Sequence, residues 1–490
     1  KWRANGSSAS SCSDTEQLPV STCLVAIHYY ILLLSAMFFS QQTKIKNIVF
    51  CVCAIDAANM VLLPASFKAL SLEMQVGPQQ LGCLTFAQSI SFALALPIWG
   101  SLIRVFSHRD LMTAGCLIWG SATLALCSST SYVIHVLLRL VIGFSLAVVN
   151  PIGQAILCDV VPEAEQGWAF GVLGAVSCAV SIVVSGCTTS IAASTIHGIK
   201  GWQLAYAVTA MLSFIMATVV HCCVPSNLSG SSSTCGKASK SWLEEQREIF
   251  SSVMGKPSFF IMVAQGITGG IPWNAFAFLP FFLQSSGYSD LQAGMIIFWG
   301  GAGAIFGNPL GGFLGDFFNQ VWPNSGRCAV AQISVLLGTG CFLLFMYAPH
   351  STQSVVLVMS LYGLFQVVCC WTQAAALRPI CGTIVTDSKE RAQVLSLWIA
   401  LEGLASAAFG APLVGLLSLR FGYGLDSMHG NLPQEANMIA IRKALVSISV
   451  LCWTLCFLAW VPMYWTYSRD RDRLAKESTQ ENYGSVQKLP

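Results

Sequence analysis

The chain has 490 residues, of which 54% are hydrophobic and only 10% are charged, and its formal net charge is +3. A water-soluble chain of this length needs far more charge to cover its surface, so the composition excludes an ordinary soluble protein and predicts an integral membrane protein. The small net charge gives no reason to expect a nucleic acid as partner.

The N-terminal extension, residues 1–47, is the hardest part of the chain to assign. The run 20–39 is apolar and long enough to cross a bilayer, and only His28 interrupts it. We expect one extra membrane helix there. An interfacial helix and the tail of a targeting sequence stay open as alternatives.

Apolar runs of about 20 residues, enough to cross a hydrocarbon core of roughly 30 Å, recur along the rest of the chain. The first six lie near 48–70, 81–104, 111–129, 132–157, 167–194 and 202–224. The second six lie near 257–284, 289–316, 327–348, 353–380, 391–419 and 439–467. The sequence therefore predicts an all-α, polytopic membrane protein with two six-helix bundles, at 48–224 and 257–467.

The polar stretch 225–256 separates the two sets of spans. It begins rich in Ser and Gly and continues as Trp242-Leu-Glu-Glu-Gln-Arg-Glu-Ile, which predicts a flexible linker and then a short amphipathic helix on the membrane surface. Lys and Arg are concentrated on the side of this linker, for example at Lys44, Lys46 and in the tail 468–490. By the positive-inside rule, the start of the first bundle, the linker and the tail are expected in the cytosol.

A polar motif follows the eighth span. Gly312-Phe-Leu-Gly-Asp316 is followed, after a short polar stretch, by Gly326-Arg327. The glycines would let two helices approach closely, Asp316 would accept hydrogen bonds from a neighbouring helix N-terminus, and Arg327 would pair across the loop. We interpret Gly312, Asp316, Gly326 and Arg327 as a gating loop whose contacts form in one state and break in another.

This motif resembles the signature loop of the major facilitator superfamily of secondary transporters. The seventh span, from Lys256-Pro-Ser-Phe-Phe to Phe278, is similar to that of Spinster-like facilitators, most closely their plant and algal branch. The resemblance covers roughly residues 48–475 and includes Arg139-Leu-Val-Ile-Gly143 in the fourth span. It implies a major facilitator fold, and animal members of the group are associated with export of sphingolipids and lysophospholipids.

Several residues depart from the pattern of that group. Asp56 lacks the Arg that usually follows it, and Leu146 stands where animal members carry Glu. Gln88 replaces an Arg of the plant pattern, and Trp398 with Ile399 replaces an Asp-Arg pair. Much of the intramembrane charge of a proton-coupled member is therefore missing, which puts proton coupling in doubt.

Three charged side chains remain inside predicted spans, and a charge in hydrocarbon needs a partner or water. Asp56 and Arg139 lie in spans that border one cavity in the resembled fold, so we expect an ion pair between them, either fixed or switching with protonation. Glu402 stands among Leu, Ala and Gly, which favours a position facing water or a ligand. A hydrogen bond from a nearby group is the alternative.

Uncharged polar and aromatic residues complete the set of candidates. Asn150 and Gln154 lie one turn apart, and Asn150-Pro151 is either a break beside a binding site or an ordinary kink. Gly269-Gly-Ile-Pro272 predicts a hinge in the seventh span, and the aromatic residues beside it suit an apolar ligand as well as ordinary packing. The substrate or coupling candidates are Asp56, Asn59, Gln88, Arg139, Asn150, Gln154, Trp273, Asn274, Phe278 and Glu402.

The sequence contains no recognisable nucleophile–base arrangement, metal-ligand cluster or phosphate-binding loop, so we expect neither an enzyme nor a cofactor or metal. The leading hypothesis is alternating-access transport of a small organic or lysolipid-like solute by a monomer surrounded by membrane lipids. Two alternatives stay open: an uncoupled facilitator or lipid scramblase, and a non-transporting sensor on the same scaffold.

Overall fold

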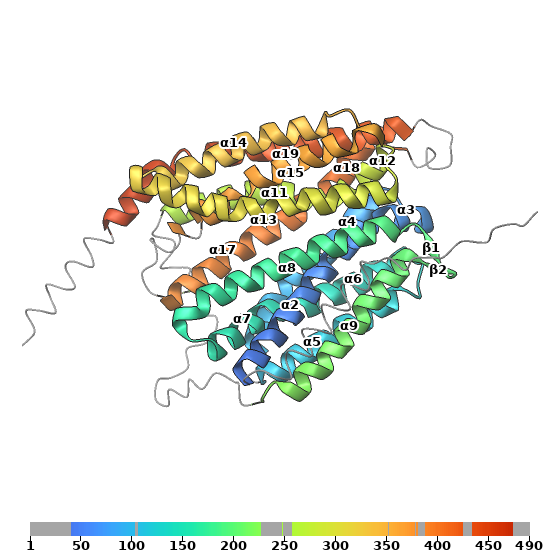
Figure 1. Cartoon of the computed structure of the whole chain (residues 1–490), viewed down its shortest axis with the longest axis horizontal. Coiled ribbons are helices and arrows are strands. Elements are labelled where there is room, and N and C mark those ends of the chain that lie inside the picture. The colour runs from blue at the N-terminus through green and yellow to red at the C-terminus, as the bar shows by residue number, and fades with distance from the viewer. Residues whose placement is uncertain are drawn as a thin grey trace, which may run out of the picture.

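The computed structural model describes residues 41–102, 106–226, 247, 257–350, 352–377, 379–380, 388–424 and 434–473. Ten of its helical segments are long and apolar enough to cross a membrane. The two halves of the chain pack against each other, with the second half (yellow to red) above the first (blue to green) in Figure 1. The helix expected in 20–39 and the amphipathic helix after the linker lie outside the described residues.

The first half consists of helices that pack mainly on one another. They are α2 (Gln41–Ala65), α3 (Phe67–Met74), α4 (Pro78–Leu102), α5 (His108–Leu126), α6 (Tyr132–Leu146), α7 (Val149–Val160), α8 (Glu163–Ile191) and α9 (Gly201–Cys223). A short antiparallel hairpin, β1 (Thr195–Ile196) and β2 (Ile199–Lys200), precedes α9. Its two turn residues, His197 and Gly198, both have positive φ (49° and 81°), as a tight hairpin turn requires.

The second half contains more broken helices than the first. Its elements are α11 (Pro257–Ala275), the 3₁₀ turn η1 (Phe276–Phe278), α12 (Leu279–Ser285), α13 (Asp290–Val321), α14 (Gly326–Met346), the 3₁₀ turn η2 (Thr352–Ser354), α15 (Val355–Cys369), the π-helical turn η3 (Gln373–Leu377), α17 (Ser388–Phe409), α18 (Ala411–Arg420) and α19 (Gln434–Ala459). Residues 463–473 are also helical.

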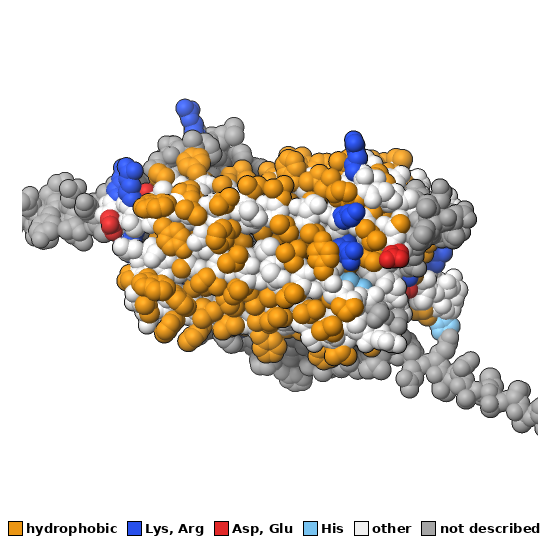
Figure 2. Space-filling model, turned by 90° about the horizontal axis from the view of Figure 1, so that it is seen from above, with side chains coloured by type: hydrophobic (Ala, Val, Ile, Leu, Met, Phe, Trp, Pro, Cys, Tyr) orange, Lys and Arg blue, Asp and Glu red, His pale blue; other side chains and the backbone are white. Residues whose placement is uncertain are grey.

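The outer surface is apolar over its middle. Hydrophobic side chains cover the central part of the face in Figure 2, and the charged side chains gather toward its ends. Phe306 and Phe313, for example, are 71% and 67% exposed on α13. Such a surface is stable against lipid tails but not against water, so the chain is an integral, multi-pass membrane protein.

Consecutive spans run in opposite directions, so the loops lie at two ends of the molecule. We call the end where α9 finishes and α11 begins the linker end. The opposite end carries the β hairpin and the starts of α4, α6 and α13.

The structure corrects several predicted helix boundaries. The fourth span is broken at Ala147 and Val148, because Pro151 cannot donate to the carbonyl four residues before it. The hinge predicted at Gly269–Pro272 is wrong, since α11 continues through Pro272 to Ala275. The break comes at η1, directly before α12, where Pro280 stands in the first turn and its missing N–H costs no helical bond.

Candidate functional site

A cavity of about 340 Å³ lies between the two halves. Its walls come from α2, α4 and α8 of the first half and from α11, η1, α12, α13 and α15 of the second, and none of its lining residues is charged. The polar lining residues are Thr85, Gln88, Ser89, Ser185, Asn274 and Tyr362. The aromatic residues Trp273 and Phe276 and several aliphatic ones complete the wall.

Gln88 connects the cavity to a buried charge. Its side-chain oxygen accepts a hydrogen bond from Nη1 of Arg139 at 2.9 Å, and Nη2 of Arg139 donates to the hydroxyl of Tyr206 at 2.6 Å. Arg139 is fully buried, and its guanidinium lies 5.3 Å from the centre of the Tyr206 ring. The positive charge therefore stands behind the wall and reaches the cavity only through the amide of Gln88.

The predicted ion pair between Asp56 and Arg139 is wrong. The guanidinium of Arg139 points between α4 and α9, whereas the polar side chains of α2 face α5. Asn59, almost one turn after Asp56, donates to Oγ1 of Thr123 on α5 at 3.1 Å. Asp56 and Asn59 are both buried inside the first half, and neither lines the cavity.

The aromatic wall belongs to the second half. Trp273 is 39% exposed, stacks on Phe365 with ring centres 6.0 Å apart, and meets Phe276 edge-on at 5.6 Å. Phe276 is backed by Phe342 and Trp453. The indole of Trp273 is therefore held in place by other rings, and part of it remains free to contact a ligand.

The remaining candidates lie away from this wall. Phe278 is fully buried against Phe67, with ring centres 4.9 Å apart, and Gln154 is exposed on α7. The side chain of Asn150 lies outside what the structure describes. Glu402 on α17 is half-buried beside Gly266 and Gly270 of α11, and it is not among the lining residues of the cavity.

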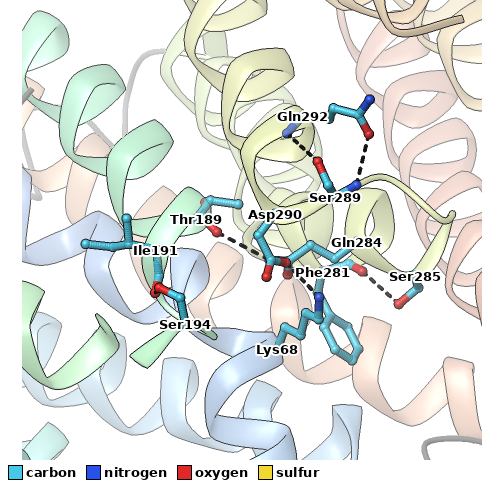
Figure 3. Close-up of polar contacts among 10 residues, drawn as sticks. All are labelled: Lys68, Thr189, Ile191, Ser194, Phe281, Gln284, Ser285, Ser289, Asp290 and Gln292. Carbon is cyan, nitrogen blue, oxygen red and sulfur yellow. Dashed lines mark hydrogen bonds and ion pairs between the residues drawn. The ribbon is translucent and has the colours of Figure 1, made fainter. Parts of the chain in front are cut away.

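Polar contacts join the two halves at the opposite end, and sequence reasoning did not find them (Figure 3). Nζ of Lys68 on α3 lies 2.7 Å from Oδ1 of Asp290, the first residue of α13. Nε2 of Gln284 donates to the same oxygen at 2.9 Å and to the carbonyl of Thr189 on α8 at 3.5 Å. Ser289 caps α13 in a capping box with Gln292, which fixes Asp290 in the first turn.

Backbone contacts close the same end. A Cβ added at Gly82 of α4 would stand 2.7 Å from the carbonyl oxygen of Ala411, and one at Gly415 of α18 would stand 2.4 Å from that of Pro78. On the other side of the interface, a Cβ at Gly294 of α13 would stand 2.5 Å from the carbonyl oxygen of Gly186. Glycine is needed at these positions because the two halves meet backbone to backbone.

Residues 48–379 match the family model of the Major Facilitator Superfamily. The chain belongs to this superfamily.

Solved structures show the same fold. A crystal structure of a bacterial homolog to the human lysosomal transporter Spinster, in an inward-facing and unoccupied conformation, matches with a TM-score of 0.73 and 16% identity over 88% of this chain and 98% of that one. The nucleoside transporter NupG matches with a TM-score of 0.65 and 12% identity over 87% of this chain and 100% of that one. A D-xylose-proton symporter matches with a TM-score of 0.62 and 12% identity, over 87% and 99%.

The signature loop of this facilitator differs in form from the prediction. Because α13 continues to Val321, Gly312 and Asp316 lie within the helix rather than in a loop. Nη2 of Arg327 is 2.7 Å from Oδ1 of Asp316, and its Nη1 donates to the carbonyl of Ala375 at 2.9 Å. All of these contacts lie within the second half.

The expected close approach at Gly312 is also wrong, since a Cβ there would meet nothing within 4 Å. The tight contacts come from a stripe of glycines at helical spacing that faces the segment from α15 through Trp371 to η3, namely Gly300, Gly303, Gly307, Gly311 and Gly315. Position 326 does require glycine, because a Cβ there would stand 2.0 Å from the carbonyl oxygen of Phe318. The spacing of the stripe was visible in the sequence, but its facing helix was not.

Proposed function

We propose that this protein is a secondary active transporter that carries a small amphipathic solute through the cavity between its two bundles by alternating access. The cavity carries this proposal, because its walls come from both halves. Among the residues that the structure describes, every hydrogen bond between the halves lies at the opposite end. Rocking of one half against the other would change the end to which the cavity opens.

The lining favours a solute with an apolar part and an uncharged hydrogen-bonding part. Trp273 and Phe276 offer flat apolar surfaces, and Gln88, Ser89 and Asn274 offer polar groups. A charged group on the solute would find no opposite charge in the wall, and Arg139 acts only through Gln88. The acyl chain of a lysolipid-like solute fits the apolar part of this wall, and its charged headgroup would have to lie outside the lining residues named here. Such a solute agrees with the resemblance to Spinster-like facilitators, with which the structural neighbour named for Spinster is consistent.

The contacts at the opposite end support a state that is open toward the linker end. Two structures of the bacterial Spinster homolog, both titled inward-facing, match with TM-scores of 0.73 and 0.68. Together with the basic residues near the linker, this supports a cytosolic position for the linker end. In sealed vesicles, we expect a protease to cleave the linker only when it is added on the cytosolic face.

The test is an uptake screen in proteoliposomes that covers lysophospholipids, sphingoid bases, nucleosides and sugars, with and without a proton gradient. We expect saturable uptake of one class and a loss of about tenfold or more in Trp273→Ala, because an aromatic anchor in a binding site commonly contributes more than 1 kcal/mol. Trp299→Ala is the matched control, since Trp299 is 59% exposed on α13 and does not line the cavity.

Two other results would contradict the proposal. Binding of a solute without any flux would support a non-transporting sensor. Equal and gradient-independent movement of many lipids, unaffected by Trp273→Ala, would support a scramblase.

A further inference from the structure

A carboxyl group outside the cavity wall has an unusual environment. Oε2 of Glu402 lies 3.0 Å from the position that a Cβ would take on Gly266, and Oε1 lies 2.9 Å from that on Gly270. The missing side chains of these two glycines on α11 leave a notch that the carboxyl group of α17 fills. No hydrogen-bond donor to this carboxyl group exists among the residues that the structure describes, and the nearby Ser406 hydroxyl donates to the backbone carbonyl of Glu402 at 2.7 Å.

The indole of Trp398 provides a second, independent observation at the same notch. Trp398 lies one turn before Glu402 on α17 and is only 4% exposed. Its Nε1 lies 2.6 Å from the same Cβ position of Gly266, yet this N–H has no hydrogen-bond partner in the described part of the chain. A buried donor without an acceptor thus stands next to a carboxyl group without a donor, and an unpaired buried donor is costly.

The chemistry of the notch favours a proton over a metal ion. Hard cations are held by several oxygen ligands, but the notch is lined by glycine backbone and an indole N–H. An ionised carboxylate without a donor or a counter-charge is costly in hydrocarbon, and a protonated carboxyl group costs far less.

We propose that Glu402 is the proton-binding group of the transport cycle and holds its proton in the packing seen here. This inference rests on the proposed transport function. Gly270 stands one turn before Asn274 on α11, so the notch lies about 6 Å along the helix from the cavity wall, toward the linker end. A shift of α11 against α17 would change the solute wall and the notch together. The proton would then leave to water, with the carboxylate free to accept the N–H of Trp398.

No other charged group competes at this position among the described residues. α11 carries no ionisable side chain, and α4 carries only Cys83, in its first turns. Arg420 lies at the far end of α18, and Cys456 is the titratable group of α19 that comes near Glu402. The thiol is the only one of these groups close enough to share the proton of Glu402.

Labelling with dicyclohexylcarbodiimide tests the proton site without a known solute, because this apolar reagent modifies protonated carboxyl groups. The full chain in phosphatidylcholine nanodiscs is labelled over a range of pH, and adducts are located by peptide mass spectrometry. We expect an adduct at Glu402 near neutral pH that decreases by about tenfold per pH unit once the carboxyl group ionises. An absent or pH-independent adduct in a folded protein would overturn the proposal.

Two alanine variants make the test specific to the notch. In Gly270→Ala the new methyl would stand 2.9 Å from Oε1 of Glu402 and 2.7 Å from Oγ of Ser406, so it should move the carboxyl group toward water and lower the pH at which labelling is lost. Gly403→Ala is the matched control, because its methyl meets nothing within 4 Å. Equal labelling curves for these two variants would contradict the claim that the notch holds the protonated carboxyl group of Glu402.

Transport then separates this inference from the proposed function. With lysophosphatidylcholine as the probe, Glu402→Gln, which imitates the protonated form, should keep solute exchange and lose accumulation driven by a pH gradient by about tenfold, or about 1.4 kcal/mol. Full gradient-driven accumulation in Glu402→Gln would overturn the proton site. No flux in the wild type with any solute class of the screen would instead overturn the transport function, with the labelling result unaffected.

Discussion

The two ends of the molecule hold the bundles in different ways. At the opposite end, Lys68 and Gln284 form hydrogen bonds between the halves, and glycines such as Gly82 and Gly415 bring the backbones into contact. At the linker end, the polar contacts of Asp316 and Arg327 stay within the second half. Within the described part of the chain, the free energy that favours one transport state over another is therefore concentrated at the opposite end.

The difference separates two roles for polar motifs in this fold. The signature pair Asp316–Arg327 fixes α13, α14 and η3 relative to one another, so it stabilises one bundle as a rigid body. The pair Lys68–Asp290 joins the two bodies and must break when they separate. Three predictions test this distinction and a fourth tests a buried histidine, and they follow in order of decreasing expected effect.

The largest effect is expected from Gly415→Leu. The backbone carbonyl of Pro78 lies where the new side chain would begin, so closure of the opposite end would be prevented. Overpacking costs about 1–3 kcal/mol, which corresponds to a shift of about 5- to 150-fold in the population of the closed state. Spin-label distances between α4 and α18 and uptake in proteoliposomes measure the change. Gly340→Leu, whose Cβ meets nothing within 4 Å, should behave as wild type.

A smaller effect is expected from charge reversal at the pair between the halves. Lys68→Asp would place two carboxylates together, and the exchanged pair Lys68→Asp with Asp290→Lys should restore the attraction. Both side chains are partly exposed (30% and 24%), so the pair contributes about 0.2–1 kcal/mol. The fraction of molecules closed at the opposite end should fall in the single variant and recover in the double one. Failure of the exchange to restore closure would show that the ion pair does not hold the halves together.

At the linker end, Arg327→Ala should lower thermal stability more than Asp316→Asn. The Arg327 side chain is only 14% exposed and also donates to the carbonyl of Ala375, whereas the Asp316 side chain is 67% exposed. We expect a loss of about 1–3 kcal/mol for Arg327→Ala and below about 1 kcal/mol for Asp316→Asn. Asp472→Asn, 61% exposed, is the control. A change in the closed fraction of the opposite end, without loss of stability, would contradict a role within one bundle.

The smallest effect concerns His350, in the loop after α14. The pKa of His350 is held below its usual value. The larger cause is burial of the imidazole against Phe282, Tyr288 and Phe345, and the smaller one is the positive charge of Arg442. The unfolded chain then binds more protons than the folded one. Stability is therefore complete above the ordinary histidine pKa of about 6.5 and is lost as the pH falls below it.

His350→Gln tests this sign. The variant should show a smaller decrease of unfolding temperature at acidic pH than the wild type. An equal decrease in both proteins would mean that other groups cause it.

Much of the architecture could be predicted from the sequence, because apolar runs and polar breaks determine where helices cross a membrane. Most spans were predicted within a few residues, and the motif around Asp316 and Arg327 indicated the superfamily correctly. The rotation of each helix about its axis could not be predicted, since nearly all faces of a membrane helix are apolar. The Asp56–Arg139 pair failed for this reason.

Contacts between segments that are distant in the chain also could not be predicted from the sequence. Lys68 and Asp290 are 222 positions apart, and neither stands in a motif. Likewise, the notch at Gly266 and Gly270 becomes recognisable only when α17 is placed on α11. Gln88, Trp273 and Asn274 were chosen as polar or aromatic residues in spans, and the structure places all three on the cavity wall.

A zero-length cross-link tests the central claim, that the halves must separate at the opposite end during transport. A water-soluble carbodiimide joins a lysine to a touching carboxylate and does not react with arginine. In Lys200→Arg, the reagent can still join Lys68 to Asp290, which are 2.7 Å apart and belong to different halves. In Lys68→Arg, it can still join Lys200 to Glu73, which both belong to the first half.

After the same treatment, cross-linked Lys200→Arg should lose uptake, and cross-linked Lys68→Arg should lose no more than the reagent removes by other reactions. Equal uptake by the two cross-linked proteins would contradict alternating access across this end.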